Sequence, residues 1–457
     1  MKLWQGRFDG ENDPVMERFN RSLDFDKRLV EEDIRGSLAY AEALFRAHLL
    51  SGTERKKMIT GLKKLLAEAD RLPFTAGDED IHMAVERLLT ERIGSAGKKL
   101  HTGRSRNEQV AVDTRLWLKK EIRILQTGMT LLMETVLERA RRHPTLIMPA
   151  FTHLQAAQPV LFSHYMLSLF FMLERDWQRF DACRERADIL PLGSGALCGS
   201  GFALDRRFLA NALGFKRISD NSLDAVADRD YLAEFLSACA ILMIHLSRYA
   251  EDLILFASPG YGFVELSDAY STGSSMMPNK KNPDSLELVR GKSGRVIGHL
   301  VNILTVMKGL PLTYNKDLQE DKEALFSGAD TVRDCLAVFS GTLATLTLNE
   351  KKIHASLDGE LLATDLADCL VEAGLPFRDA HAVVGRIVRE ARKADKSLLQ
   401  MTSRELQGYS PLFPKNYRPS FAHSIRRRSL YGGTGASSVA AQLRQAMTRL
   451  KKMKRVS

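Results

Sequence analysis

The chain has 457 residues, of which 44 % are hydrophobic and 27 % are charged, a composition that suits a globular protein and excludes a disordered or fibrous chain. Its five cysteines are scattered, odd in number and never spaced as CxxC, which argues against a disulfide framework and against a zinc site. No signal peptide and no run of about 20 apolar residues is present, so we expect a cytoplasmic protein that contacts no membrane. The net charge of +10 is spread along the chain without a nucleic-acid-binding motif, so we expect no nucleic-acid partner and a solvated basic tail at 449–455.

Helical patterns dominate the chain from one end to the other. Residues 1–107 contain shorter amphipathic segments with a glycine-rich break at 94–97. Five segments of about 25–35 residues follow, the first four of them stopping at a proline, and all are well above the mean helix length of about 11–12. They are expected at 110–142, 160–190, 222–258, 283–310 and 318–348. Helices of ordinary length complete the chain after residue 357.

Several of the long segments are apolar on more than one face, as in Phe235–Leu246. Helices of this kind must be buried, and five such rods in one chain cannot all be covered within a monomer. We therefore predict an all-α protein whose bundle of five long helices is shared between subunits. The predicted domains are an N-terminal helical domain (1–107), a central long-helix domain (108–357) and a small C-terminal helical domain (358–457).

No known cofactor motif is complete in this sequence. The stretch Gly193–Cys198 ends in cysteine where a dinucleotide-binding loop needs its last glycine, and Leu286 stands where a P-loop needs its first. No HExxH is present. We expect no cofactor and no catalytic metal.

Three polar stretches between the long helices are candidates for chemistry, because functional groups concentrate on loops held by rigid scaffolds. The first, Leu100–Val112, places Arg106 and Asn107 at a helix start, where guanidinium and backbone N–H groups favour a carboxylate. A capped helix with surface arginines is the alternative. The second, Pro149–Pro159, is a loop in which His153 lies between two prolines, where it is either structural or a general acid.

The third stretch, Ser271–Glu287, contains Ser274, Ser275, two lysines and a predicted helix N-terminus at Pro283 capped by Asn282. Such a combination is typical of an anion-binding loop. A basic surface loop explains the lysines but not the Gly-Ser-Ser before them.

Together these stretches resemble the fumarase/aspartase superfamily, whose signature loop is similar to GSSMMPNKKNPD here. Within it, the similarity is closest to the argininosuccinate lyase family. Six stretches resemble that family, in colinear order along essentially the whole chain. They are LWQGRFDG near the N-terminus, EDIHMAVE, HTGRSRNEQVAVDTRLW, FTHLQAAQP, NSLDAVADRDY and YNKDLQEDKE. Glu108, Asn279 and the C-terminal GGTGASS depart from the family's usual residues without changing the proposed catalytic groups.

The resemblance implies an amidine-lyase (EC 4.3.2.1) that reversibly splits argininosuccinate into arginine and fumarate, the last step of arginine biosynthesis. It implies a homotetramer with a 20-helix core and active sites built from three subunits. Ser274 would be the base, activated by Lys280, and His153 the acid, oriented by Glu287. The residues that the resemblance places around the substrate are Ser22, His82, Arg106, Asn107, Thr152, Arg229, Asn282, Tyr314, Gln319 and Lys322.

Three other functions are compatible with parts of the sequence. Another fumarate-releasing lyase, such as adenylosuccinate lyase or fumarase, keeps the serine loop but differs in the HTGRSRN and KDLQEDKE stretches. A non-catalytic, crystallin-like homologue would not need Ser274, His153, Lys280 and Glu287 together. A basic nucleic-acid binder would bind only weakly and with strong salt dependence.

Overall fold

A computed structural model describes residues 12–456, so the LWQGRFDG stretch lies outside the described residues. The chain divides into two compact units, each formed by three separated segments. Unit 1 comprises the described residues up to Leu125 together with Gln178–Ala240 and Arg295–Val332. Unit 2 comprises Gln126–Trp177, Ile241–Gly294 and the residues from Arg333 onward.

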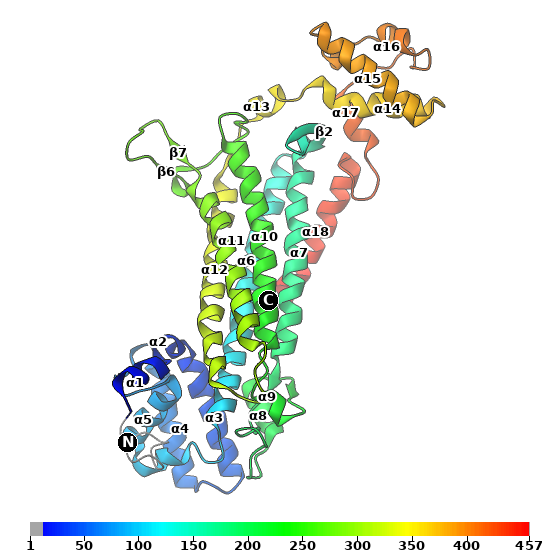
Figure 1. Cartoon of the computed structure of the whole chain (residues 1–457). Helices are drawn as coiled ribbons and strands as arrows, with labels where there is room; N and C mark the ends of the chain where they lie inside the picture. Colours follow the sequence, from blue (N-terminus) through cyan, green and yellow to red (C-terminus); the bar gives the residue numbers. More distant parts are fainter. Residues whose placement is uncertain (1–11, 457) are drawn as a thin grey trace. The chain divides into compact units, whose positions relative to one another are not determined.

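The five predicted long helices are confirmed (Figure 1). Each contributes one part to each unit. They are α6 (Arg106–Arg142), α7 (Phe162–Ala187), α10 (Asp230–Ala257), α11 (Asp284–Met307) and α12 (Asp321–Thr345). Two segments are less continuous than predicted. A separate turn, α9 (Ser222–Ala225), precedes α10, and a 3-10 helix (Lys316–Glu320) precedes α12. The five long helices confirm the predicted all-α class.

Unit 1 contains shorter helices, most of which pack against one another. They are α1 (Pro14–Asn20), α2 (Leu23–Asp26), α3 (Val30–Arg46), α4 (Gly52–Ala67), α5 (Ile81–Ile93) and α8 (Arg206–Leu213). Tyr40, Leu44, Leu62 and Leu89 form part of its buried core. Two residues of β3 (Ile189–Leu190) pair in parallel with β4 (Arg217–Ile218).

Unit 2 contains most of the strand pairing. The hairpin β1 (Ile147–Thr152) and β2 (Gln155–Leu161) is antiparallel. Two short antiparallel pairs join β5 (Val264–Glu265) to β8 (Thr347–Leu348) and β6 (Thr272–Gly273) to β7 (Lys281–Asn282). The prediction of an irregular loop around His153 is therefore wrong, because these residues form the turn of a hairpin.

The C-terminal helices of unit 2 carry an apolar cluster of their own. The helices are α13 (Glu350–Ala355), α14 (Ala363–Glu372), α15 (Phe377–Lys393), α16 (Ser403–Tyr409), α17 (Phe421–Arg427) and α18 (Ala436–Val456). The cluster includes Leu366, Leu370, Ile387, Leu406 and Phe413, all within the predicted third domain.

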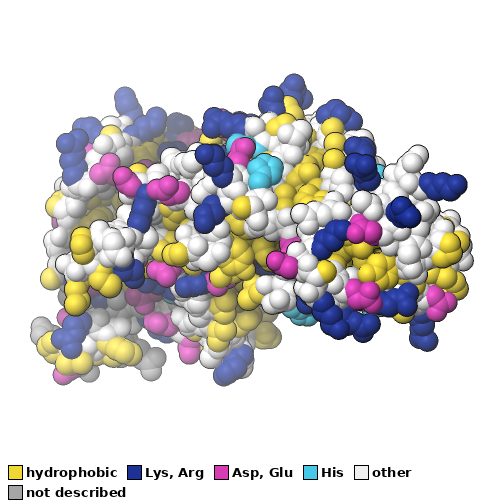
Figure 2. Space-filling model, turned by 90° about the horizontal axis from the view of Figure 1, so that it is seen from above, with side chains coloured by type: hydrophobic (Ala, Val, Ile, Leu, Met, Phe, Trp, Pro, Cys, Tyr) yellow, Lys and Arg dark blue, Asp and Glu magenta, His cyan; other side chains and the backbone are white. Residues whose placement is uncertain are grey.

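The basic stretch at 449–455 is helical rather than a free tail, although Lys451, Lys452, Lys454 and Arg455 are exposed to solvent as expected. It forms the last turns of α18, where Leu450 and Met453 are buried. Arg449 donates to Glu174 on α7 at 2.8 Å. Lysine and arginine side chains are scattered over the face shown in Figure 2, with acidic and apolar side chains between them.

Among the described residues, α10 is the one helix long and apolar enough to cross a membrane. More than half of its most apolar window is buried inside the protein. A core helix has the same properties, so α10 on its own is weak evidence for a membrane span.

Candidate active site

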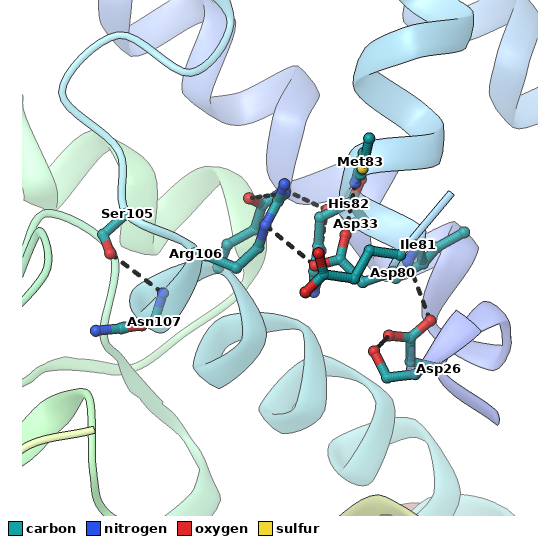
Figure 3. Close-up of polar contacts among 12 residues, drawn as sticks. Asp26, Asp33, Asp80, Ile81, His82, Met83, Ser105, Arg106 and Asn107 are labelled. Atoms are coloured by element: carbon teal, nitrogen blue, oxygen red, sulfur yellow. Dashed lines mark hydrogen bonds and ion pairs between the residues drawn. The ribbon is translucent and has the colours of Figure 1, made fainter. Parts of the chain in front are cut away.

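In unit 1, Ser22 is held by an aspartate that the sequence analysis did not select. The Ser22 hydroxyl donates to Asp26 Oδ2 at 2.5 Å, and the other oxygen of Asp26 accepts the backbone N–H of Ile81 at 3.0 Å (Figure 3). Burial raises the pKa of Asp26. Asp26 thus ties the predicted substrate residue Ser22 to the start of α5.

Arg106 and Asn107 lie in the first turn of α6, as the sequence predicted. Arg106 Nε lies 3.3 Å from Asp80 Oδ2, and Asp80 also caps α5 by accepting the N–H of Met83 at 2.7 Å. Burial alone would raise the pKa of Asp80, but the positive charge of Arg106 lowers it overall. Asn107 donates its side-chain amide to the carbonyl of Ala196 at 3.2 Å.

Glu108, which departs from the family's usual aspartate, fastens a loop to this helix start. One carboxylate oxygen accepts the N–H groups of Gly193 and Gly195 at 2.6 and 3.0 Å, and the other accepts Ser105 N–H at 3.1 Å. The longer side chain is thus fully used in backbone hydrogen bonds.

His82 lies on α5 and is buried, with Nδ1 at 2.8 Å from Asp33 Oδ1 on α3. Its Nε2 is also buried and has no hydrogen-bond partner among the described residues. In Figure 3, His82 lies beside Asp80 and Arg106. The structure thus places the predicted residues His82 and Arg106 in one polar cluster.

Arg229 and Lys322 share one buried carboxylate. Arg229 Nε donates to Asp321 Oδ2 at 2.5 Å, and Lys322 Nζ donates to Asp321 Oδ1 at 2.6 Å. Burial would raise the pKa of Asp321, but Lys322 and Arg229 lower it overall. Arg229 Nη2 remains buried without a hydrogen bond within the described chain, so this donor is available to an anion.

Gln319 and Tyr314 also lie in unit 1. Gln319 donates to the carbonyl of Asn20, two residues before Ser22, at 3.2 Å. Burial raises the pKa of Tyr314 to about 12, which keeps the phenol protonated as a donor. Unit 1 therefore contains the eight predicted residues Ser22, His82, Arg106, Asn107, Arg229, Tyr314, Gln319 and Lys322.

In unit 2, His153 and Leu154 form the two-residue turn of the β1–β2 hairpin. Their φ values are +54° and +58°, the left-handed region that residues with a side chain adopt at a cost. Thr152 ends β1 beside them, and all three side chains are exposed. Strained turns of this kind often carry functional groups, which suits the proposed role of His153.

Ser274 lies in the seven-residue loop between β6 and β7. Its Oγ accepts backbone N–H groups from Met276 at 3.3 Å and Met277 at 3.0 Å. Two amide donors aimed at one hydroxyl oxygen favour negative charge on that oxygen.

The other predicted residues of this loop have different surroundings. Asn282 donates to the carbonyl of Gly273 at 3.5 Å, and α11 begins one residue later than predicted, with the Pro283 carbonyl accepting Glu287 N–H at 3.1 Å. Lys280 is exposed, and no described side chain pairs with its ammonium group. Lys281, by contrast, pairs with Asp268 at 2.7 Å.

Glu287 and His153 are not brought together within this chain. Glu287 is exposed at the start of α11 and lies 3.9 Å from Arg290, while no hydrogen bond of the described residues involves the His153 ring. The hairpin and the serine loop are separate features of unit 2 (Figure 1).

Asp26, Asp80 and Asp321 are the site residues that sequence reasoning missed. Asp80 lies in the EDIH stretch, two residues before His82, and Asp321 lies in the EDKE stretch, directly before Lys322. For Asp80 and Asp321 the available signal was an acidic residue at a predicted helix start, close to a predicted binding residue; Asp26 had no such signal.

Comparison with known proteins gives a consistent assignment. Residues 6–298 match the lyase family, and residues 360–423 match the argininosuccinate lyase C-terminal family. The argininosuccinate lyase of Moorella thermoacetica is 50 % identical, covering 98 % of this chain and 97 % of the relative. That of Carboxydothermus hydrogenoformans is 49 % identical, covering 98 % and 99 %.

Among solved structures, a variant of EDDS lyase with bound fumarate matches with a TM-score of 0.83 at 25 % identity. The match covers 98 % of this chain and 92 % of that one. The helical fold, the serine loop, the basic residues at the start of α6 and the full-length similarity agree, and the chain belongs to the argininosuccinate lyase family of the fumarase/aspartase superfamily.

Proposed function

We propose that this enzyme catalyses the reversible elimination of argininosuccinate to arginine and fumarate, with Ser274 as the base and His153 as the acid. A proton leaves the succinyl carbon for the seryl oxygen. The electron pair of that C–H bond forms the double bond of fumarate as the C–N bond breaks. The departing guanidino nitrogen takes a proton from His153.

The observation that carries this proposal is the pair of amides on Ser274 Oγ. A neutral hydroxyl is a weak base, and its alkoxide needs positive surroundings. Met276 N–H and Met277 N–H supply two donors, and the unpaired ammonium of Lys280 lies in the same loop. Preorganised donors of this kind are typically worth about 10²–10³ in rate each.

The two units offer complementary binding groups. In unit 1, Arg106, Asn107 and Arg229 supply donors for substrate carboxylates, and His82 lines the same site. Ser22, Tyr314, Gln319 and Lys322 are proposed to hold the amino-acid part of the substrate. In unit 2, Thr152, Lys280 and Asn282 add donors near the reacting carbons, and Glu287 orients His153.

We further propose a homotetramer in which each active site takes residues from three subunits. Support comes from exposed apolar side chains on one face of α11, where Ile297, Val301 and Leu304, spaced i, i+4 and i+7, are 39 %, 57 % and 50 % exposed. A soluble monomer rarely exposes such a row of apolar residues on one helix. A partner subunit that covers α11 would also bring its own Glu287 and Ser274 toward neighbouring chains.

The described cysteines are all free, four buried and Cys198 exposed. Free thiols suit a reducing compartment, so we place the enzyme in the cytoplasm.

A panel of substrates tests this function. The purified enzyme is incubated separately with argininosuccinate, adenylosuccinate and malate while fumarate is followed by its absorbance. Fumarate release from argininosuccinate alone is the expected result. Release from one of the other two would assign the chain to a different lyase activity, and no release from any would indicate a non-catalytic homologue.

A further inference from the structure

Two buried aspartates face His82 from neighbouring helices, and the proposed mechanism uses neither of them. His82 Nδ1 lies 2.8 Å from Asp33 Oδ1 on α3 and 3.3 Å from Asp113 Oδ2 on α6. All three side chains are at most 1 % exposed. One ring nitrogen of His82 and one carboxylate oxygen of each aspartate all lie within 4.8 Å of one another.

If both aspartates are ionised, this trio has more buried hydrogen-bond acceptors than donors. Asp33 Oδ2 and both oxygens of Asp113 are buried and accept no hydrogen bond in the described chain. Two unscreened carboxylates this close repel strongly, and buried acceptors without donors cost further free energy. One additional proton placed between the two carboxyl groups removes the repulsion and supplies the missing donor.

We infer that Asp113 is protonated in the folded enzyme and donates to the Asp33 carboxylate, which in turn accepts Nδ1–H of His82. Asp33 and Asp113 are then positioning residues. They fix the hydrogen of the imidazole on Nδ1 and leave Nε2 as the ring atom that faces the substrate. The link to substrate rests on the proposed role of His82, whereas the protonation of Asp113 does not.

The charged and polar groups around the pair assign the proton to Asp113 rather than to Asp33. Asp33 is the better-stabilised anion, because Gln109 Nε2 donates to its Oδ1 at 2.5 Å in addition to His82. Burial would raise the pKa of Asp33, but His82, Arg104 and Gln109 lower it overall. Burial and the neighbouring Asp33 raise the pKa of Asp113, with Glu32 adding to the rise and Arg104 opposing it.

A bound cation is a poorer solution than a proton at this position. The Asp33 oxygen already accepts donors from His82 and Gln109, and the positive charge of Arg104 acts on both carboxyl groups. Space is also short, because a methyl group added at Gly36 on α3 would lie 3.3 Å from Asp113 Oδ1.

Infrared spectroscopy of the whole enzyme tests the protonation directly. The difference spectrum between wild type and Asp113→Asn at neutral pH is expected to contain the C=O stretch of a protonated carboxylic acid. A carboxylate band in its place would overturn the inference, as would stoichiometric divalent metal in the purified enzyme. If Asp113→Asn does not assemble, the wild type is labelled isotopically at its aspartate side-chain carboxyls. The pH titration of the labelled bands then reports whether Asp113 is protonated.

Stability gives a second reading that does not depend on activity. Because the pKa of Asp113 is raised above 3.8 in the folded protein, folding takes up a proton above that pH. Wild type should therefore lose stability relative to Asp113→Asn as pH rises from about 4 toward the folded pKa. A difference that does not change with pH would contradict a protonated Asp113.

Kinetics separates the positioning role from a general structural one. Asp113→Ala should lower kcat/KM for argininosuccinate by about 10–100-fold, and Asp113→Asn, which keeps a donor, should restore most of that loss. Asp33→Asn should be as damaging as Asp113→Ala. Equal loss in Asp113→Asn and Asp113→Ala would overturn the positioning role. An enzyme inactive on argininosuccinate would disprove the proposed function, while the infrared and stability results would still decide the protonation.

Discussion

At the scale of single residues, the site depends on aspartates that hold the predicted binding groups in place. Asp26 fixes Ser22, Asp80 fixes Arg106, and Asp321 joins Arg229 to Lys322. The basic and hydroxyl residues could be predicted from the sequence through family resemblance. Their pairing with these acidic residues could not, because a contact across 92 residues of chain, as between Arg229 and Asp321, leaves no local sequence pattern.

The Asp321 pair gives a prediction about stability. Asp321→Asn leaves two buried cations without their counter-charge, so the free energy of unfolding should fall by about 3–5 kcal/mol. Urea unfolding at neutral pH measures the loss. As a control, Asp330→Asn removes a half-exposed partner of Arg28 and should cost less than about 1 kcal/mol.

The same pair has a defined pH dependence. The pKa of Asp321 is lowered in the folded protein, so its stabilisation is present above the ordinary value of 3.8 and is lost as pH falls through the folded pKa. The stability gap between wild type and Asp321→Asn should therefore narrow below about pH 4. A gap that widens on acidification would contradict this assignment.

At the scale of elements, the long helices were predictable and the hairpin was not. Helical spacing of apolar residues marks all five long helices within a few residues, and a following proline marks the ends of α6, α7, α10 and α11. The β1–β2 hairpin turns on His153 and Leu154, neither of which is a residue that usually marks a left-handed turn. The proposed acid His153 therefore lies in a turn that local sequence rules do not predict.

In this hairpin, glycine substitutions at two nearby residues should change stability in opposite directions. Leu154→Gly removes the strain of a left-handed residue whose side chain is exposed, so it should stabilise the hairpin by up to about 1 kcal/mol and raise the thermal midpoint. Ala156→Gly, inside β2, should lower the midpoint, since glycine weakens a strand by about 0.5–1 kcal/mol. Destabilisation by Leu154→Gly would show that this turn carries no such strain.

At the scale of the whole molecule, the proposed catalytic residues Ser274 and His153 belong to separate features of unit 2. Ser274 lies in the β6–β7 loop and His153 in the β1–β2 turn, and the described residues contain no hydrogen bond between these two features. The exposed apolar row on α11 offers a surface through which other subunits could complete the site. Both observations favour active sites shared between subunits.

Mixing two inactive variants tests this sharing. In the proposed tetramer, Ser274→Ala and His153→Asn subunits that are dissociated and reassembled together should recover about a quarter of wild-type activity, because each site then draws its serine and its histidine from different subunits at random. Each variant reassembled alone is the control and should stay inactive. No recovery in the mixture would place both residues of a site in one subunit.

The most direct test of the account compares wild type and Ser274→Ala with argininosuccinate as substrate. Wild type should release fumarate. Ser274→Ala should bind the substrate with similar affinity in a calorimetric titration, yet its turnover should fall by at least about 10²-fold, since the seryl oxygen acts only on the transferred proton. Near-normal fumarate release by Ser274→Ala would contradict the role of this serine as the base.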